Sequence, residues 1–244
     1  MMPTEPVTLH YTFTLPKNRT LSFDIRLDGR TLQLITTPAT SAPAWTRLSF
    51  QQCPNCPLNE AEHPQCPIAA NLAGVVEPFR DADSQTPVTV EVTAAARAYR
   101  TQTTLQRGLS SLLGIYMVTS GCPVMDKLRP MVRTHLPFAQ PEETFYRLLS
   151  MYLLAQYVRQ KSEATPDWGL RDLPAMLEQI RLVNHYFAQR LASLATKDAT
   201  LNALQNLNGL ADTASLMLQE DQLQSIERLF RMYLTPAPDA AAHG

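Results

Sequence analysis

The sequence predicts an α+β fold, in which a small antiparallel β-rich region is followed by an α-helical bundle. Two patterns carry this prediction. Apolar and polar residues alternate within residues 7–36, as they do in strands that are buried on one face. From Thr103 onward, apolar residues recur three and four positions apart, which is the spacing of one helix face. We therefore place the β-rich region at residues 1–102 and the helical bundle at residues 103–235.

The β-rich region is expected to begin with three antiparallel strands. The alternating apolar positions of the first two are Val7, Leu9, Tyr11, Phe13 and Leu15, and then Leu21, Phe23, Ile25 and Leu27. Asp28-Gly29 is a strong signal for a two-residue hairpin turn, so the third strand is expected at 31–35. A helix over 67–79 and strands over 86–92 and around 97–101 complete this half of the chain.

Residues typical of helix ends divide the second half into successive helices. Gly121 ends the first, and Pro123 starts a short helix that Pro130 breaks or kinks. Asp172 and Asp198 suit the N-caps of two later helices. The expected segments are 103–121, a short helix from 123, 145–160, 172–195, 198–218 and 220–234, with a disordered tail over 236–244.

The composition is that of a globular protein with little charge bias. The net charge of −1 gives no overall field that would attract nucleic acid or an anionic membrane. With 8 glycines, the chain has no P-loop and no dinucleotide-binding motif. It has neither a signal-peptide pattern nor an apolar stretch near the roughly 18 residues of a membrane span. We expect a cytoplasmic protein whose partner is another protein or a small molecule, and nothing indicates the oligomeric state.

All 4 cysteines are followed directly by proline, and their spacing is C-x2-C-x9-C-x55-C. This spacing suits a metal site whose ligands are Cys53, Cys56, Cys66 and Cys122. A C-x2-C pair brings two sulfurs to one ion from a single turn. Because proline favours the first position of a helix, Cys66 and Cys122 are expected at helix N-caps. The partial positive charge there favours a thiolate.

Several occupants of this site fit the pattern. Structural zinc is the leading interpretation, and an iron–sulfur cluster is the main alternative, since both use four cysteines. Four unlinked thiols in turns and haem ligation by a Cys-Pro pair remain open. His63 lies between the second and third cysteines and is a spare ligand, although a His-Pro in a polar loop is more often exposed.

A basic cluster follows the last cysteine and consists of Lys127, Arg129, Arg133 and His135. It could bind an anionic ligand beside the metal site or balance the charge of the thiolates. The simpler interpretation is the solvated face of a broken helix.

The phrases QCPNCPL, CPIAANL, SGCP, LRPM, HLPFA and EET together resemble an uncharacterised bacterial protein family, a domain of unknown function, over residues 8–234. The resemblance implies a bacterial origin and no particular activity.

The function expected from the sequence is a regulatory or binding role for a protein with a structural four-cysteine metal site. The first alternative is a redox protein or sensor, in which the same cysteines hold an iron–sulfur cluster or react themselves. The second is an enzyme that acts on an anionic small molecule near Cys122. Whether the protein is an enzyme stays open at this point.

Overall fold

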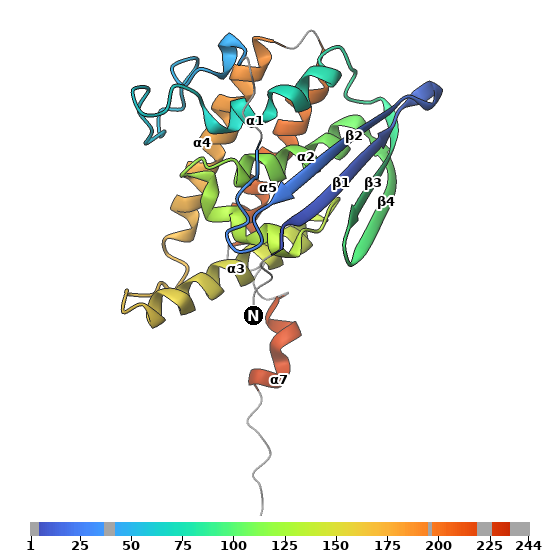
Figure 1. The fold of residues 1–244 in the computed structure, drawn as a ribbon. Helices are drawn as coiled ribbons and strands as arrows, with labels where there is room; N and C mark the ends of the chain where they lie inside the picture. Colours follow the sequence, from blue (N-terminus) through green and yellow to red (C-terminus); the bar gives the residue numbers. More distant parts are fainter. Residues whose placement is uncertain (1–4, 37–41, 195–196, 219–225, 235–244) are drawn as a thin grey trace, which may run out of the picture.

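The structure is a computed structural model that describes residues 5–36, 42–194, 197–218 and 226–234. Within this part of the chain, an antiparallel sheet formed by early residues is joined to a set of helices formed mainly by later ones (Figure 1). The α+β class is therefore confirmed. The tail expected to be disordered, residues 236–244, lies outside the described residues.

The sheet has four antiparallel strands in the order β2-β1-β3-β4. Their bounds are β1 (Val7–Thr14), β2 (Thr20–Leu27), β3 (Pro87–Ala94) and β4 (Arg97–Thr104). In the central strand, Tyr11 pairs with Phe23 on one side and with Val92 on the other. The alternation along β1 buries Leu9, Tyr11 and Phe13 on one face, which is the pattern that predicted the strand. The strands expected near 86–92 and 97–101 are confirmed.

The third strand expected at 31–35 does not form. Leu34 makes only an isolated bridge to Leu27, and its N–H donates to the carbonyl of Thr119. The Asp28 carboxylate accepts hydrogen bonds from the N–H groups of Arg30 and Thr31, which closes a tight local turn. Leu32 follows with a φ of 60°, so the chain leaves the extended conformation that a strand requires.

Helix α2 (Leu105–Thr119) lies across the apolar face of the sheet. Gly108 marks the closest approach, because a Cβ atom there would lie 2.8 Å from Val90 Cγ2 and 2.9 Å from Phe13 Cε1. Only glycine lets the helix backbone come so near the sheet. Leu105 and Leu109 are fully buried beside this contact.

The remaining helices extend this core. Their bounds are η1 (Pro16–Asn18), η2 (Ala44–Thr46), α1 (Pro67–Val76), η3 (Glu77–Phe79), η4 (Met125–Thr134), α3 (Pro141–Lys161), α4 (Leu173–Ala192), α5 (Ala199–Met217), η5 (Arg228–Phe230) and α7 (Arg231–Leu234). One hydrophobic core contains Val88 of β3, Leu109 of α2, Phe187 of α4 and Ala203 of α5. The division at residues 102 and 103 stays a prediction. No helix among the described residues is long and apolar enough to cross a membrane.

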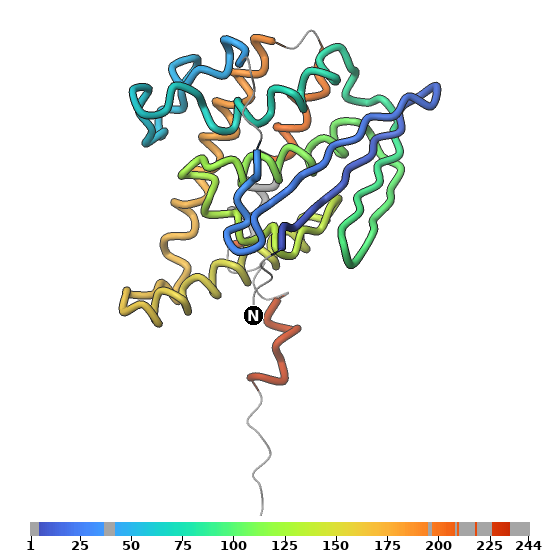
Figure 2. Tube along the Cα trace, in the orientation of Figure 1, coloured from blue at the N-terminus to red at the C-terminus, as the bar shows by residue number. Residues whose placement is uncertain are grey.

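The segment from 42 to 66 runs beside α4, although the two are far apart in the sequence (Figure 2). Asn55 donates to the backbone carbonyl of Gln179 in α4 at 2.9 Å. Within the segment, the Leu48 N–H donates to the Pro64 carbonyl at 3.0 Å. This loop carries the first three cysteines and is positioned by the helix rather than by strands of its own.

Candidate metal centre

The first two cysteines lie on one tight turn. The Cys56 N–H donates to the Cys53 carbonyl at 3.0 Å, which folds the C-x2-C stretch back on itself. The Gln52 side chain donates to the Leu58 carbonyl at 3.1 Å and closes the turn from outside. Both cysteines therefore reach the same region from a single short loop, as the C-x2-C spacing predicts.

Cys66 is the N-cap residue of α1, and Pro67 occupies the first helical position. Both parts of that prediction are confirmed. The Cys66 N–H donates to the Thr46 carbonyl at 2.8 Å, which attaches the start of the helix to the preceding loop. The third cysteine is thus held at the start of a helix.

Cys122 follows Gly121, whose φ of 87° ends α2 in a left-handed conformation. The helix expected to start at Pro123 begins two residues later, as the 3-10 helix η4. Cys122 nevertheless resembles an N-cap residue. Its thiol accepts hydrogen bonds from the N–H groups of Val124 and Met125, and its carbonyl accepts one from Asp126 at 2.9 Å.

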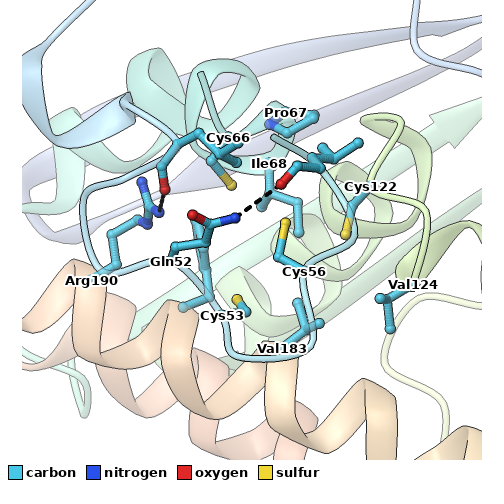
Figure 3. Close-up of a pocket in the computed structure, with 13 residues that line it drawn as sticks. Gln52, Cys53, Cys56, Cys66, Pro67, Ile68, Cys122, Val124, Val183 and Arg190 are labelled. Carbon is cyan, nitrogen blue, oxygen red and sulfur yellow. Dashed lines mark hydrogen bonds between the residues drawn. The ribbon is translucent and has the colours of Figure 1, made fainter. Parts of the chain in front are cut away.

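The structure brings the four cysteines to one small cavity of about 20 Å³ (Figure 3). All four are free thiols; Cys122 is buried and the other three are partly buried. The other lining residues are mainly apolar and include Leu48, Leu58, Ile68, Val124, Val183 and Phe187. Residues from the loop, from α1, from α4 and from the segment after α2 therefore enclose the thiols together.

Burial dominates the chemistry of these thiols. Together with smaller contributions from Cys66, Cys122 and Cys56, it raises the pKa of Cys53 to about 12, although the nearby Arg190 charge lowers it. Burial also raises the pKa of Cys122 to about 11, although the N–H groups of Met125 and Val124 lower it. The expectation of an ionised Cys122 is therefore wrong for the protein without a bound metal, because loss of solvent outweighs the helix-end effect.

Arg190 of α4 is a site residue that the sequence reasoning missed. Its side chain is 2% exposed and lines the cysteine cavity. The guanidinium donates to the carbonyls of Trp45 and Arg47, each at 2.8 Å, and to those of Leu48 and Gln51 at 3.3 and 3.4 Å. Burial lowers the pKa of Arg190, while the charges of Cys66, Cys53 and Cys56 raise it.

A signal for Arg190 is present in the sequence. Val183 and Phe187 lie on the buried face of α4, and Arg190 continues that face one turn later. An arginine within an apolar helix stripe indicates a buried charge that needs acceptors. Here four loop carbonyls supply them, and no ion pair of the described residues includes Arg190.

The donor set fits a soft metal, because four thiols with no other strong ligand suit zinc or an iron–sulfur cluster. Within the described residues, no group of three or more His, Cys, Asp or Glu side chains is already arranged as the ligands of one ion. His63 is exposed and is absent from the cavity lining. In this structure His63 is therefore not positioned to replace one of the cysteines as a ligand.

The basic cluster does not converge on the cysteines. Arg129 pairs with Asp126 at 2.9 Å, and Arg133 donates to the Gly29 carbonyl at 2.7 Å. Lys127 is exposed. His135 lines a second and larger cavity, and its Nε2 lies 2.7 Å from the Tyr11 hydroxyl. Anion binding by these four residues together stays a prediction.

Fold and site define an α+β protein with four cysteines gathered in one buried cavity between its loop segment and its helices. The chain belongs to the family described as a domain of unknown function, DUF6901, whose model matches residues 9–231. The family resemblance read from the cysteine phrases is thereby confirmed. Searches of curated proteins and of solved structures each found no match.

Proposed function

We propose that the protein binds one metal centre through Cys53, Cys56, Cys66 and Cys122, and that this centre fixes the loop segment 42–66 to the helices. One observation carries the proposal: four cysteines from three separate parts of the chain line a single enclosed cavity. Four neutral thiols would gain little by gathering in an apolar site, whereas four metal ligands must meet.

The charge balance around the site supports this proposal. Four thiolates around a divalent ion carry a net charge of about −2, which is costly to bury unless positive groups lie near it. Arg190 is a buried cation beside three of the cysteines. The N–H groups that donate to the Cys122 thiol, and the N-cap position of Cys66, add partial positive charge.

Zinc is the metal we propose first, because four cysteines complete its tetrahedral shell and leave no open position. An iron–sulfur cluster is the second candidate, because four cysteines in apolar surroundings also hold such clusters. The cavity volume of about 20 Å³ is little more than the roughly 10–15 Å³ that one water molecule needs, and so suits a single ion better.

The role we propose for the protein is binding or regulation rather than catalysis at the metal. A four-cysteine shell is closed to substrate, so the centre would act by holding its surroundings in place. Those surroundings include α4 and the segment that follows α2. Both also form walls of a larger cavity, which is discussed below.

The test is elemental analysis of protein purified without oxygen, together with its absorption spectrum. A colourless protein with about one zinc per chain supports the structural site, and a brown protein with iron and sulfide supports the cluster. Cys56→Ser and Cys122→Ser should each lose the metal. Structural zinc contributes on the order of 10 kcal/mol in small domains, so their melting temperatures should fall by at least about 10 °C.

His63→Ala is the matched control for these variants, because His63 is exposed and off the cavity. It should keep full metal content and normal melting. Wild-type protein without zinc or iron, or cysteine variants that melt as the wild type does, would overturn the proposal.

A further inference from the structure

A second cavity, of about 730 Å³, lies among β4, α2, η4, α3, α4 and α5. This volume falls within the range of about 300–1,000 Å³ that is usual for small-molecule sites. Much of the lining is apolar and includes Ile115, Val118, Leu128, Met131, Leu148, Leu177 and Ile180. The cavity is therefore large enough to bury an organic molecule against an apolar wall.

The charged groups of this cavity have one sign. Arg107 and Arg147 belong to the lining, and the described lining residues include no aspartate or glutamate. Arg147 is partly buried, and desolvation lowers its pKa. The nearby Tyr99 and Glu143 raise the pKa of Arg147 again, but neither of them lines the cavity. The described lining therefore presents arginines and no carboxylate, which favours an anionic ligand.

Three buried polar atoms in the same lining lack hydrogen-bond partners among the described residues: Arg147 Nε, Asn184 Oδ1 and Asn206 Nδ2. Asn184 is 2% exposed, so its amide is fully withdrawn from solvent. Leaving such a group unpaired costs about 1–3 kcal/mol, and most buried polar groups in proteins avoid it. Their gathering at one cavity indicates that a ligand supplies the missing partners.

One polar wall of the cavity is already fixed. The Tyr11 hydroxyl is hydrogen-bonded to Ser111 Oγ at 2.9 Å and to His135 Nε2 at 2.7 Å. Arg147 donates through a terminal nitrogen to the Met131 carbonyl at 2.8 Å, which holds the guanidinium while its Nε stays free of protein acceptors among the described residues. The guanidinium is thus held in place before any ligand arrives.

We propose that this cavity binds a small organic carboxylate with an apolar body. The carboxylate pairs with Arg147, the body packs on the aliphatic wall, and a hydroxyl or amide group of the ligand meets Asn184 and Asn206. None of the four cysteines lines this cavity, so the ligand would not contact the metal centre.

The test uses the full-length protein and isothermal titration calorimetry with two probes of equal length, octanoate and octanamide. Octanoate should saturate one site per chain and bind about tenfold more tightly than octanamide, the usual gain from a charge-assisted hydrogen bond. Arg147→Gln should remove that preference. Arg129→Gln is the matched control, because Arg129 pairs with Asp126 outside the cavity lining, and it should keep the preference.

A second variant tests the role of the Asn184 amide and does not require octanoate. If Asn184 serves a ligand, then Asn184→Leu removes a buried amide oxygen that has no partner among the described residues, and it should raise the melting temperature of the ligand-free protein. No saturable octanoate binding, equal affinity for the two probes, or a preference that survives Arg147→Gln would overturn the proposal. A lower melting temperature for Asn184→Leu would show instead that the amide supports the fold.

Discussion

The two cavities lie against the same helix, α4, but have no lining residue in common and differ in almost every other respect. Val183 and Arg190 of α4 face the cysteine cavity, whereas Ile180 and Asn184 of the same helix face the larger one. The smaller cavity has a volume of about 20 Å³ and four thiols, and the larger has about 730 Å³ and two arginines. One helix therefore separates an enclosed, sulfur-lined site from a roomy site lined with cations and amides.

The difference lies in how the buried polar groups are satisfied. Arg190 donates to four backbone carbonyls of the loop, so the protein itself completes its hydrogen bonds. Arg147 Nε and Asn184 Oδ1 have no such partners within the described residues. A satisfied buried cation holds structure together, and unsatisfied ones are a cost that a ligand can offset. We therefore expect a structural role for the cysteine cavity and a ligand-binding role for the larger one.

Among the variants that keep all four cysteines, the largest effect on stability is expected from replacing Arg190, whose hydrogen bonds the protein itself completes. Arg190→Met should lower the free energy of unfolding by about 3–5 kcal/mol, because it leaves loop carbonyls buried without donors. Arg190→Lys should recover only part of the loss, since an ammonium cannot reach the carbonyls that the planar fork spans. Chemical denaturation measures the free energy of unfolding of both variants.

Arg181→Gln is the control for the Arg190 variants, because it removes an arginine from the exposed side of the same helix. Its ion pair with Glu178 is a surface pair, worth less than about 1 kcal/mol. A loss for Arg190→Met no greater than for Arg181→Gln would refute the structural role of the buried cation.

A smaller effect on stability, dependent on pH, is expected from His135, which lines the larger cavity. Burial, with a contribution from the Arg147 charge, lowers the pKa of His135 to about 3. The unfolded chain has an ordinary histidine pKa of about 6.5, so between these values the unfolded state binds more protons and stability falls as pH falls. From pH 7 to pH 5 this loss should be about 2 kcal/mol.

His135→Gln isolates this contribution, because glutamine cannot titrate and can still hydrogen-bond to the Tyr11 hydroxyl. Unfolding by urea at pH 7 and pH 5 should show a smaller pH dependence in the variant, by about 2 kcal/mol. Equal pH dependence in the two proteins would mean that folding does not lower the pKa of His135.

The sequence predicted the periodic elements and the gathering of the four cysteines better than it predicted anything else that depends on tertiary contacts. Alternation located the four strands, and the Cys-Pro pairs located the Cys66 N-cap. The strand expected at 31–35 failed because Thr119, distant in sequence, takes the Leu34 N–H. Arg190 and Arg147 were missed because their roles come from carbonyls and cavities that only the folded chain assembles.

The smallest effect concerns how Cys122 is directed into the cysteine cavity. Gly121 has a φ of 87°, and a Cβ atom there would meet only Gln33 Nε2, at 3.5 Å. Gly121→Ala therefore has room, and its cost is backbone strain of about 1–2 kcal/mol. Since the strain falls beside Cys122, which we propose as a metal ligand, metal content should decrease while octanoate binding stays as in the wild type.

Gly74→Ala is the matched control, and it should raise stability where Gly121→Ala lowers it. Gly74 lies inside α1 with nothing within 4 Å of an added Cβ, so alanine should raise helix stability by about 0.5–1 kcal/mol. Thermal melting and metal analysis of the two variants separate strain at the cysteine from a general effect of added methyl groups. If Gly121→Ala melts as the wild type does with full metal, the left-handed turn is not what positions Cys122, and the enclosing residues of α4 must do so.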